Sequence, residues 1–240
     1  VDRRNNLVAK YDQAFGDFAK DDKILAGMDE FGAKAYQMMR STKAREAFDL
    51  TQESPAISGL FDEQSFSQSC LLATRLVESG VKFVTLNLGG WDTHTGQGQL
   101  YGKHRQLLGN VALAFQAFYR DMQDQWGDMV IVTMTEFGRT SKENGSRGTD
   151  HAEATAMFVA GGSVKGGVYN CDRKTWKNGD MFSTKNERYL LRKTDFRSVF
   201  GEIFTDHFGD SRKQLNQVIP TYAAARKENP NDFKKLGLFA

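Results

Sequence analysis

Two short apolar segments, separated by a long amphipathic pattern, constrain the fold of this chain most. Residues 81–88, VKFVTLNL, and 128–134, DMVIVTM, are β-rich and almost continuously apolar, as buried strands of a parallel sheet are. Between them, apolar residues recur at spacings of three and four and predict a long helix, through Leu108, Val111, Phe115, Phe118 and Met122. AMFVAGG, residues 156–162, is a third strand candidate. This order predicts a right-handed βαβ unit in an α/β core.

The chain before residue 81 has a different pattern. One-sided apolar spacings predict three amphipathic helices, over residues 7–18, 24–38 and 66–77. Gly80 is the expected C′ residue of the third helix, and Cys70 inside it is expected to be a buried free thiol. A further helix is predicted over 196–204, with Thr194 or Asp195 as its N-cap.

These patterns predict one domain in three parts. They are a helical segment packing on the core (1–80), the α/β core with the site (81–210) and a C-terminal surface tail (211–240). The composition excludes several classes. Lys and Arg number 32 against 30 Asp and Glu, and a net charge of +2 argues against a nucleic-acid or anionic-membrane surface. No apolar run approaches the length of about 18 residues that spans a bilayer. Two cysteines are too few for a disulfide scaffold.

The loops that follow the strand candidates carry the chemistry. In GGWDTH, residues 89–94, Asp92 and His94 are two positions apart, so extended backbone points both to one side. A carboxylate and an imidazole can then reach one ion, and such sets suit zinc, manganese or iron. The alternative is a turn capped by Asp92 with His94 on the surface, which an isolated D-x-H pair favours.

Two further loops extend the pattern. In TEFGRT, residues 135–140, Glu136 follows a strand candidate and Arg139 is suited to grip an anion; the alternative is a surface Glu–Arg pair. In NGSRGTDHA, residues 144–152, His151 precedes a strand candidate, while Asn144 and Arg147 could meet an oxyanion; the alternative is a polar turn. Only four histidines occur, and two stand close to an Asp in such loops, which favours a shared site.

Five stretches, in order, resemble the family called domain of unknown function 1501. They lie within about residues 65–210 and are GGWDTH (89–94), 129–140, NGSRGTDHA (144–152), the GG-x-V-x-GG turn (161–167) and KTDFRSVFGEIF (193–204). That family is similar to the alkaline phosphatase and sulfatase superfamily. The resemblance implies an α/β sandwich with a mostly parallel central sheet flanked by helices. It also implies hydrolysis of phosphate or sulfate esters with a divalent metal: Zn, Mn, Mg or Ca.

The resemblance also implies site residues. Asp92, His94 and His151 resemble superfamily metal ligands; Glu136 stands at a further ligand position, but Phe137 replaces a ligand histidine. We therefore expect Asp92, His94, Glu136 and His151 to cluster, with Arg139, Arg147 and Asn144 binding a small anionic ester. The catalytic nucleophile is unassigned, because the superfamily places it in an N-terminal strand that has no counterpart before residue 81. The alternative function is an inactive relative serving as a binding or assembly module.

The family resemblance carries two expectations about context. Its members begin with a strand missing here, often behind a twin-arginine export signal, which implies a periplasmic or extracellular bacterial protein. We therefore expect this chain to be the C-terminal part of a longer protein. Its sheet would then show an open slot, or one filled by the missing segment or a second chain.

Overall fold

The computed structural model describes residues 30, 32, 42–98, 102–170, 181–182, 187–211 and 213–240. The chain forms two compact units, one comprising Val1–Gly59 and Gln68–Leu86, the other Leu60–Ser67 and Asn87–Ala240. The predicted helices over 7–18 and 24–38 lie outside the described residues, except for positions 30 and 32, which are helical. None of the helices in the described part is both long and apolar enough to cross a membrane.

The first unit is helical, and one arginine ties its elements together. It contains α3 (Thr42–Phe48), η1 (Leu50–Gln52), α4 (Pro55–Ser58) and most of α5 (Ser65–Glu78). Arg75 of α5 donates to the backbone carbonyls of Glu46 and Ala47 at the end of α3, over 2.6 and 3.0 Å, and to Glu53 over 2.7 Å. A guanidinium there supplies donors to carbonyls at a helix end, in addition to the Asp49 N–H, which donates to the Glu46 carbonyl over 3.2 Å.

Helix α5 confirms the prediction over residues 66–77. It is followed by Gly80, whose φ of 97° is left-handed and whose N–H donates to the Val77 carbonyl over 2.8 Å. Cys70 is fully buried and free, as expected, and burial raises the pKa of its thiol to about 12. The thiol is therefore neutral at physiological pH. Cys171 lies outside the described residues.

The second unit contains two of the three predicted strand regions, 128–134 and 156–162. Its long helix is α6 (Lys103–Asp121), followed by η2 (Gln123–Asp128). Four two-residue strands follow: β1 (Ile131–Val132), β2 (Gly138–Arg139), β3 (His151–Ala152) and β4 (Val159–Ala160). The C-terminal elements are α7 (Phe196–Glu202), the π-helix η3 (Ile203–His207), α8 (Leu215–Val218), α9 (Tyr222–Glu228) and η4 (Pro230–Phe233).

The described strands form two antiparallel ladders. β1 pairs with β4 so that Ile131 faces Ala160, and β2 pairs with β3 so that Arg139 faces His151. β1 and β4 thus lie where strands were predicted, over 128–134 and 156–162, but they pair antiparallel rather than parallel. Residues 81–88, also predicted to be a strand, have no ladder partner within the described part of the chain. The mostly parallel sheet of a phosphatase-like sandwich stays a prediction.

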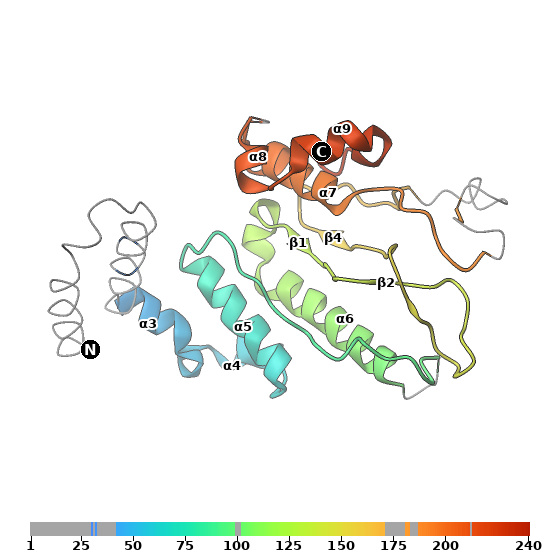
Figure 1. Ribbon diagram of the computed structural model, residues 1–240. Coiled ribbons are helices and arrows are strands. Elements are labelled where there is room, and N and C mark those ends of the chain that lie inside the picture. The colour runs from blue at the N-terminus through green and yellow to red at the C-terminus, as the bar shows by residue number, and fades with distance from the viewer. Residues whose placement is uncertain are drawn as a thin grey trace, which may run out of the picture. The chain divides into compact units, whose positions relative to one another are not determined.

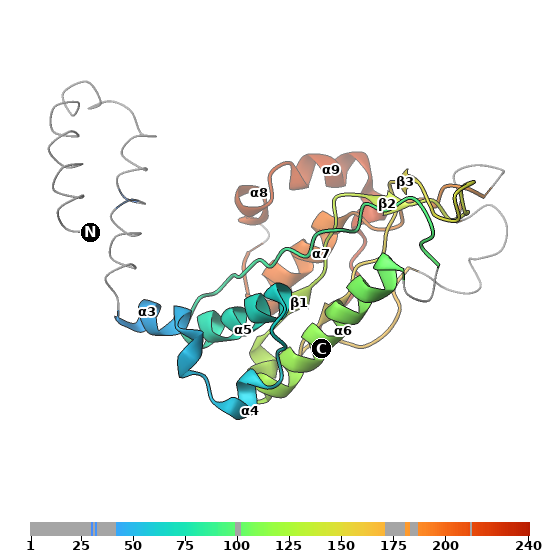
Figure 2. The same cartoon turned by 90° about the horizontal axis from the view of Figure 1, so that it is seen from below.

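The core of the second unit lies between the β1–β4 ladder and the C-terminal elements. Its buried residues are Val199 and Ile203 of α7 and η3 together with Leu238 and Phe239, and the flanks of β1 and β4 pack against them. Figures 1 and 2 show α6 on the opposite side of this ladder. Residues 211–240 were expected to be a surface tail. They instead form helices and place Leu238 and Phe239 in the core, at 3% and 8% exposure.

A buried carboxylate holds the end of the chain in this core. Glu202 is 6% exposed and accepts hydrogen bonds from the backbone N–H groups of Leu236, Gly237 and Leu238, the last two over 2.9 and 3.0 Å. An unpaired buried carboxylate would be strongly disfavoured, so these donors explain why Glu202 is tolerated on the buried side of α7.

Helix α7 begins at one of the two predicted N-cap residues. The cap is Asp195, whose carboxylate accepts a hydrogen bond from the Arg197 N–H over 2.9 Å.

Candidate metal centre

Two histidine side chains, from segments distant in the sequence, converge on one carboxylate oxygen of Asp92. His94 Nε2 lies 3.0 Å from Asp92 Oδ1, and His151 Nε2 lies 2.7 Å from the same oxygen. One potential ligand atom from each of the three residues lies within 4.8 Å of the other two. The side chains are accessible, with Asp92 66% and both histidines 44% exposed. Of the four expected ligands, the structure brings together Asp92, His94 and His151.

The cluster exists because two irregular loops dock on each other. The backbone N–H of Gly96 donates to the Ser146 carbonyl over 3.1 Å, and that of Gln97 donates to the Arg147 carbonyl over 3.0 Å. The Thr149 hydroxyl adds a 2.7 Å hydrogen bond to the Gln97 side chain. These contacts hold residues 92–97 against residues 144–150, while the β2–β3 ladder fixes His151.

Gly148 allows the close approach of the two loops. A Cβ atom at this position would lie 2.2 Å from the backbone oxygen of His94, far inside van der Waals contact. Only glycine therefore fits against the His94 backbone in this arrangement. Gly145 in the same loop has no heavy atom within 4 Å of its would-be Cβ, so the requirement is local to Gly148.

Asn144 organises the second loop from inside. Its Oδ1 accepts from the backbone N–H groups of Ser146 and Gly148, over 2.9 and 3.1 Å. Its Nδ2 donates to the His94 carbonyl and to Asp150 Oδ1, both over 3.0 Å. Asn144 was expected to bind an oxyanion. Its polar atoms are instead engaged within the protein, and they shape the loop around His94.

Arg139 also has protein partners. Its two terminal nitrogens donate to the Thr149 carbonyl over 2.8 Å and to the Trp91 carbonyl over 2.6 Å. His104 Nε2 lies 3.1 Å from the same Trp91 oxygen. Arg139 was expected either to bind an anion or to pair with a nearby glutamate. Instead it links the loop that carries Asp92 to the loop that carries His151.

Phe137 occupies the position beside His151. The two rings stack with centroids 4.1 Å apart and planes at 9°, and the Arg139 guanidinium lies 5.0 Å from the Phe137 centroid. Glu136, the fourth expected ligand, is exposed and is not part of the ligand group found among the described residues. The TEFGRT motif was expected to contribute a metal ligand, Glu136. It contributes instead the Phe137 ring, which stacks on His151 and orients it.

Asp150 and Arg188 complete the surroundings of the cluster, and neither was predicted as a site residue. Asp150 Oδ1 lies 3.6 Å from His94 Nδ1, which is longer than a hydrogen bond, and Arg188 donates to Asp150 Oδ2. Hydrogen bonding by Asn144 and the charge of Arg188 lower the pKa of Asp150. The pKa of Asp92 is also lowered, chiefly by its contact with His151 and then by that with His94. Both carboxylates are therefore ionised at neutral pH.

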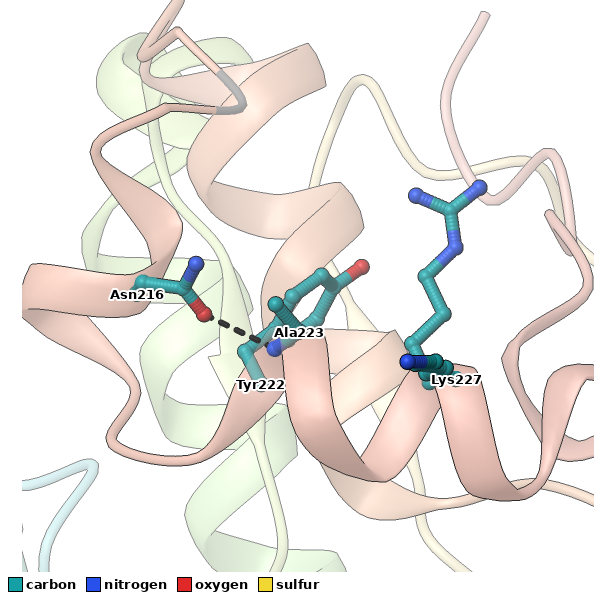
Figure 3. Close-up of a pocket in the computed structure, with 5 residues that line it drawn as sticks. Asn216, Tyr222, Ala223 and Lys227 are labelled. Atoms are coloured by element: carbon teal, nitrogen blue, oxygen red, sulfur yellow. Dashed lines mark hydrogen bonds between the residues drawn. The ribbon is translucent and has the colours of Figure 1, made fainter.

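A separate pocket lies in the C-terminal helices (Figure 3). It has a volume of about 400 Å³ and is lined by Asn216, Tyr222, Ala223, Arg226 and Lys227. Asn216 Oδ1 accepts from the Ala223 N–H over 2.8 Å and closes one side of it. No lining residue belongs to the Asp–His cluster. We place the candidate chemistry at the cluster, because a carboxylate and two imidazoles converge there, whereas no carboxylate or imidazole lines the pocket.

Comparison with known proteins agrees with the motifs. No curated protein and no solved structure matches this chain. Residues 1–195 match a family described as "Protein of unknown function (DUF1501)". The match includes the two loops of the metal centre and reaches further toward the N-terminus than the motifs quoted above, while most of KTDFRSVFGEIF lies beyond it. Since it covers most of the chain, the protein belongs to the DUF1501 family.

Proposed function

We propose that this protein is a metal-dependent hydrolase of phosphate or sulfate esters, in which Asp92, His94 and His151 hold a divalent ion. The observation that supports the proposal best is the convergence of two imidazole nitrogens on one carboxylate oxygen at an accessible place. Two histidines and an aspartate are a common catalytic ligand set, and three protein ligands leave a position open for substrate or water.

The chemistry of the donors narrows the choice of metal. Imidazole nitrogens suit zinc and other transition metals, whereas magnesium and calcium prefer oxygen ligands. Zinc or manganese therefore fits this set better than the other two ions considered. Such an ion polarises a phosphoryl or sulfuryl oxygen and lowers the pKa of bound water. The protein contributes two docked loops that hold the ligands together and leave them accessible to an ester.

Arg147 is the better candidate for binding the anionic group. Arg139 and Asn144 already bind carbonyl or carboxylate oxygens of the protein. Arg147 is exposed on the loop that docks against His94, and its guanidinium makes no hydrogen bond or ion pair within the described residues. A guanidinium with free donors can grip a phosphate or sulfate through two parallel hydrogen bonds.

A second candidate function is a non-catalytic binding or assembly module. The observation in its favour is Phe137, whose ring stacks on His151 and which stands where the related superfamily carries a ligand histidine. A site with one ion can also stabilise a loop instead of performing catalysis. For either function, a location outside the bacterial cytoplasm is a proposal that rests on the family resemblance.

Metal binding to variants tests the proposal. Isothermal titration with ZnCl₂ and with MnCl₂ should show one site in the wild-type protein, and binding should be lost in His94→Ala and His151→Ala. His207→Ala is the matched control, because His207 lies in η3 and contacts the Asp128 carbonyl instead of the cluster. A panel of p-nitrophenyl phosphate and sulfate then separates the two functions. Zinc binding without turnover favours the module, and a wild-type protein that binds neither metal contradicts the metal-dependent hydrolase.

A further inference from the structure

The geometry assigns a positioning role to Asp150: it orients His94 for metal binding from the side of the ring away from Asp92. This inference rests on the proposed function, because it concerns the ion that Asp92, His94 and His151 would hold. Asp150 is not itself one of the grouped ligands. It acts through His94.

The two nitrogens of His94 face two different carboxylates. Nε2 is directed to Asp92 Oδ1, over 3.0 Å, together with Nε2 of His151. Nδ1 is directed to Asp150 Oδ1, over 3.6 Å. If Nε2 binds an ion, the proton of the neutral ring must sit on Nδ1, where Asp150 is the facing acceptor. For Asp150 to accept this proton, the His94 ring must approach it from 3.6 Å to hydrogen-bond distance.

Asp150 is held in place independently of His94. Asn144 donates to Asp150 Oδ1 over 3.0 Å, and Arg188 donates to Oδ2. The Asp150 N–H itself donates to the Thr140 hydroxyl over 3.2 Å. The carboxylate is thus fixed from both oxygens and from its own backbone. A fixed acceptor behind a ligand histidine sets the tautomer and the orientation of the ring.

Asn144 couples this acceptor to the ligand it would orient. The same Nδ2 group that donates to Asp150 also donates to the His94 backbone carbonyl over 3.0 Å. The backbone of His94 and the carboxylate facing its ring therefore share one anchor. The two carboxylates face different nitrogens of the histidines. Asp92 faces Nε2 of both rings, whereas Asp150 faces Nδ1 of His94 alone.

The test is zinc affinity in Asp150→Asn, measured by competition with a chromophoric chelator. Removing an outer carboxylate of this kind costs about 10–100-fold in metal affinity, so the variant should bind zinc that much more weakly with unchanged stoichiometry. Glu153→Gln is the matched control. Glu153 lies three residues after Asp150 and pairs with Arg192 over 2.7 Å, so this variant also removes one negative charge from a paired carboxylate. It should bind zinc as the wild type does.

Nuclear magnetic resonance gives a second readout that a merely structural role would not move. In the zinc-loaded wild type, the His94 ring should show a slowly exchanging Nδ1–H, and Asp150→Asn should shift or lose that signal while circular dichroism stays unchanged. Arg188→Gln is the alternative variant if Asp150→Asn fails to fold. It keeps Asp150 but removes one of the groups that hold the carboxylate, so it should also weaken zinc binding. Wild-type affinity and an unchanged Nδ1–H signal in Asp150→Asn would overturn the inference alone. A wild-type protein that binds no zinc would overturn the proposed function with it.

Discussion

At the scale of single residues, the metal centre consists of one carboxylate and two imidazoles that two docked loops hold together. Asp92, His94 and His151 stand in Gly-rich loops next to apolar segments, and this placement was enough to predict that they would converge. Arg139 and Asn144 also lie beside the cluster, as predicted. Their partners turned out to be protein carbonyls and carboxylates, because a donor's chemistry does not distinguish a backbone acceptor from a ligand.

Asp150 and Arg188 were missed for a different reason. Asp150 is adjacent to His151, and adjacent side chains diverge, which correctly separates Asp150 from His151. What the sequence does not show is that the loop at residue 94 docks against the other side of Asp150. Arg188 lies 38 positions from the aspartate it binds, and no motif marks it.

The prediction at this scale concerns Gly148. Gly148→Ala places a Cβ 2.2 Å from the His94 oxygen, so the two loops must separate. We expect a loss of about 1–3 kcal/mol of unfolding free energy, as for other overpacked sites, and a weaker zinc site. Gly145→Ala meets no atom within 4 Å, so its stability should stay within about 0.5 kcal/mol of the wild type. Urea unfolding and zinc titration of both variants measure this. Equal behaviour of the two alanine variants would contradict the close-contact argument.

At the scale of elements, helices were predicted better than strand pairing. The period of apolar residues located α5, α6 and α7, because helical contacts are local. On α6 the buried side is slightly rotated from the predicted one: Leu107 is 3% exposed, whereas Leu108 is 53% exposed. The apolar runs located β1 and β4 but not their partner or direction, since pairing depends on contacts far along the chain.

The prediction for α7 is a pH dependence of stability. Arg197, through hydrogen bonds from its side chain and backbone, lowers the pKa of the Asp195 cap. Because the folded pKa lies below the unfolded value of about 3.9, the stabilisation is complete above that value and is lost as pH falls through the folded pKa. Asp195→Asn keeps a capping side chain but not the charge. Its unfolding free energy should therefore fall less steeply than that of the wild type between pH 5 and pH 2.

Urea unfolding across that pH range provides the measurement. Asp124→Asn, an exposed carboxylate in η2, serves as the matched control and should keep the wild-type slope. Asp92 and Asp150 also have lowered pKa values, but they are present in all three proteins, so their effect cancels in the comparison. Parallel curves for the wild type and Asp195→Asn would show that the cap does not depend on its charge.

At the scale of the whole molecule, the metal centre belongs entirely to the second unit, yet its ligands are far apart along the chain. His151 follows Asp92 by 59 residues, and only the docked loops bring them together. An unfolded chain would have to close this long loop before it could offer all three ligands to one ion, which costs conformational entropy. A divalent ion should therefore bind the folded protein far more tightly than the unfolded one.

The prediction that follows is a zinc-dependent gain in stability. At a zinc concentration of about 100 times Kd, the folded state should gain about 2.7 kcal/mol, which raises Tm by roughly 5–10 °C for a chain of this size. Scanning calorimetry with zinc, and again after EDTA, measures the shift and its reversal. Amide exchange should slow in residues 91–98 and 144–152, because the ion joins these two loops directly. His94→Ala combined with His151→Ala should abolish both effects. A Tm that zinc lowers or leaves unchanged would mean that the three side chains do not act as one site of the folded protein.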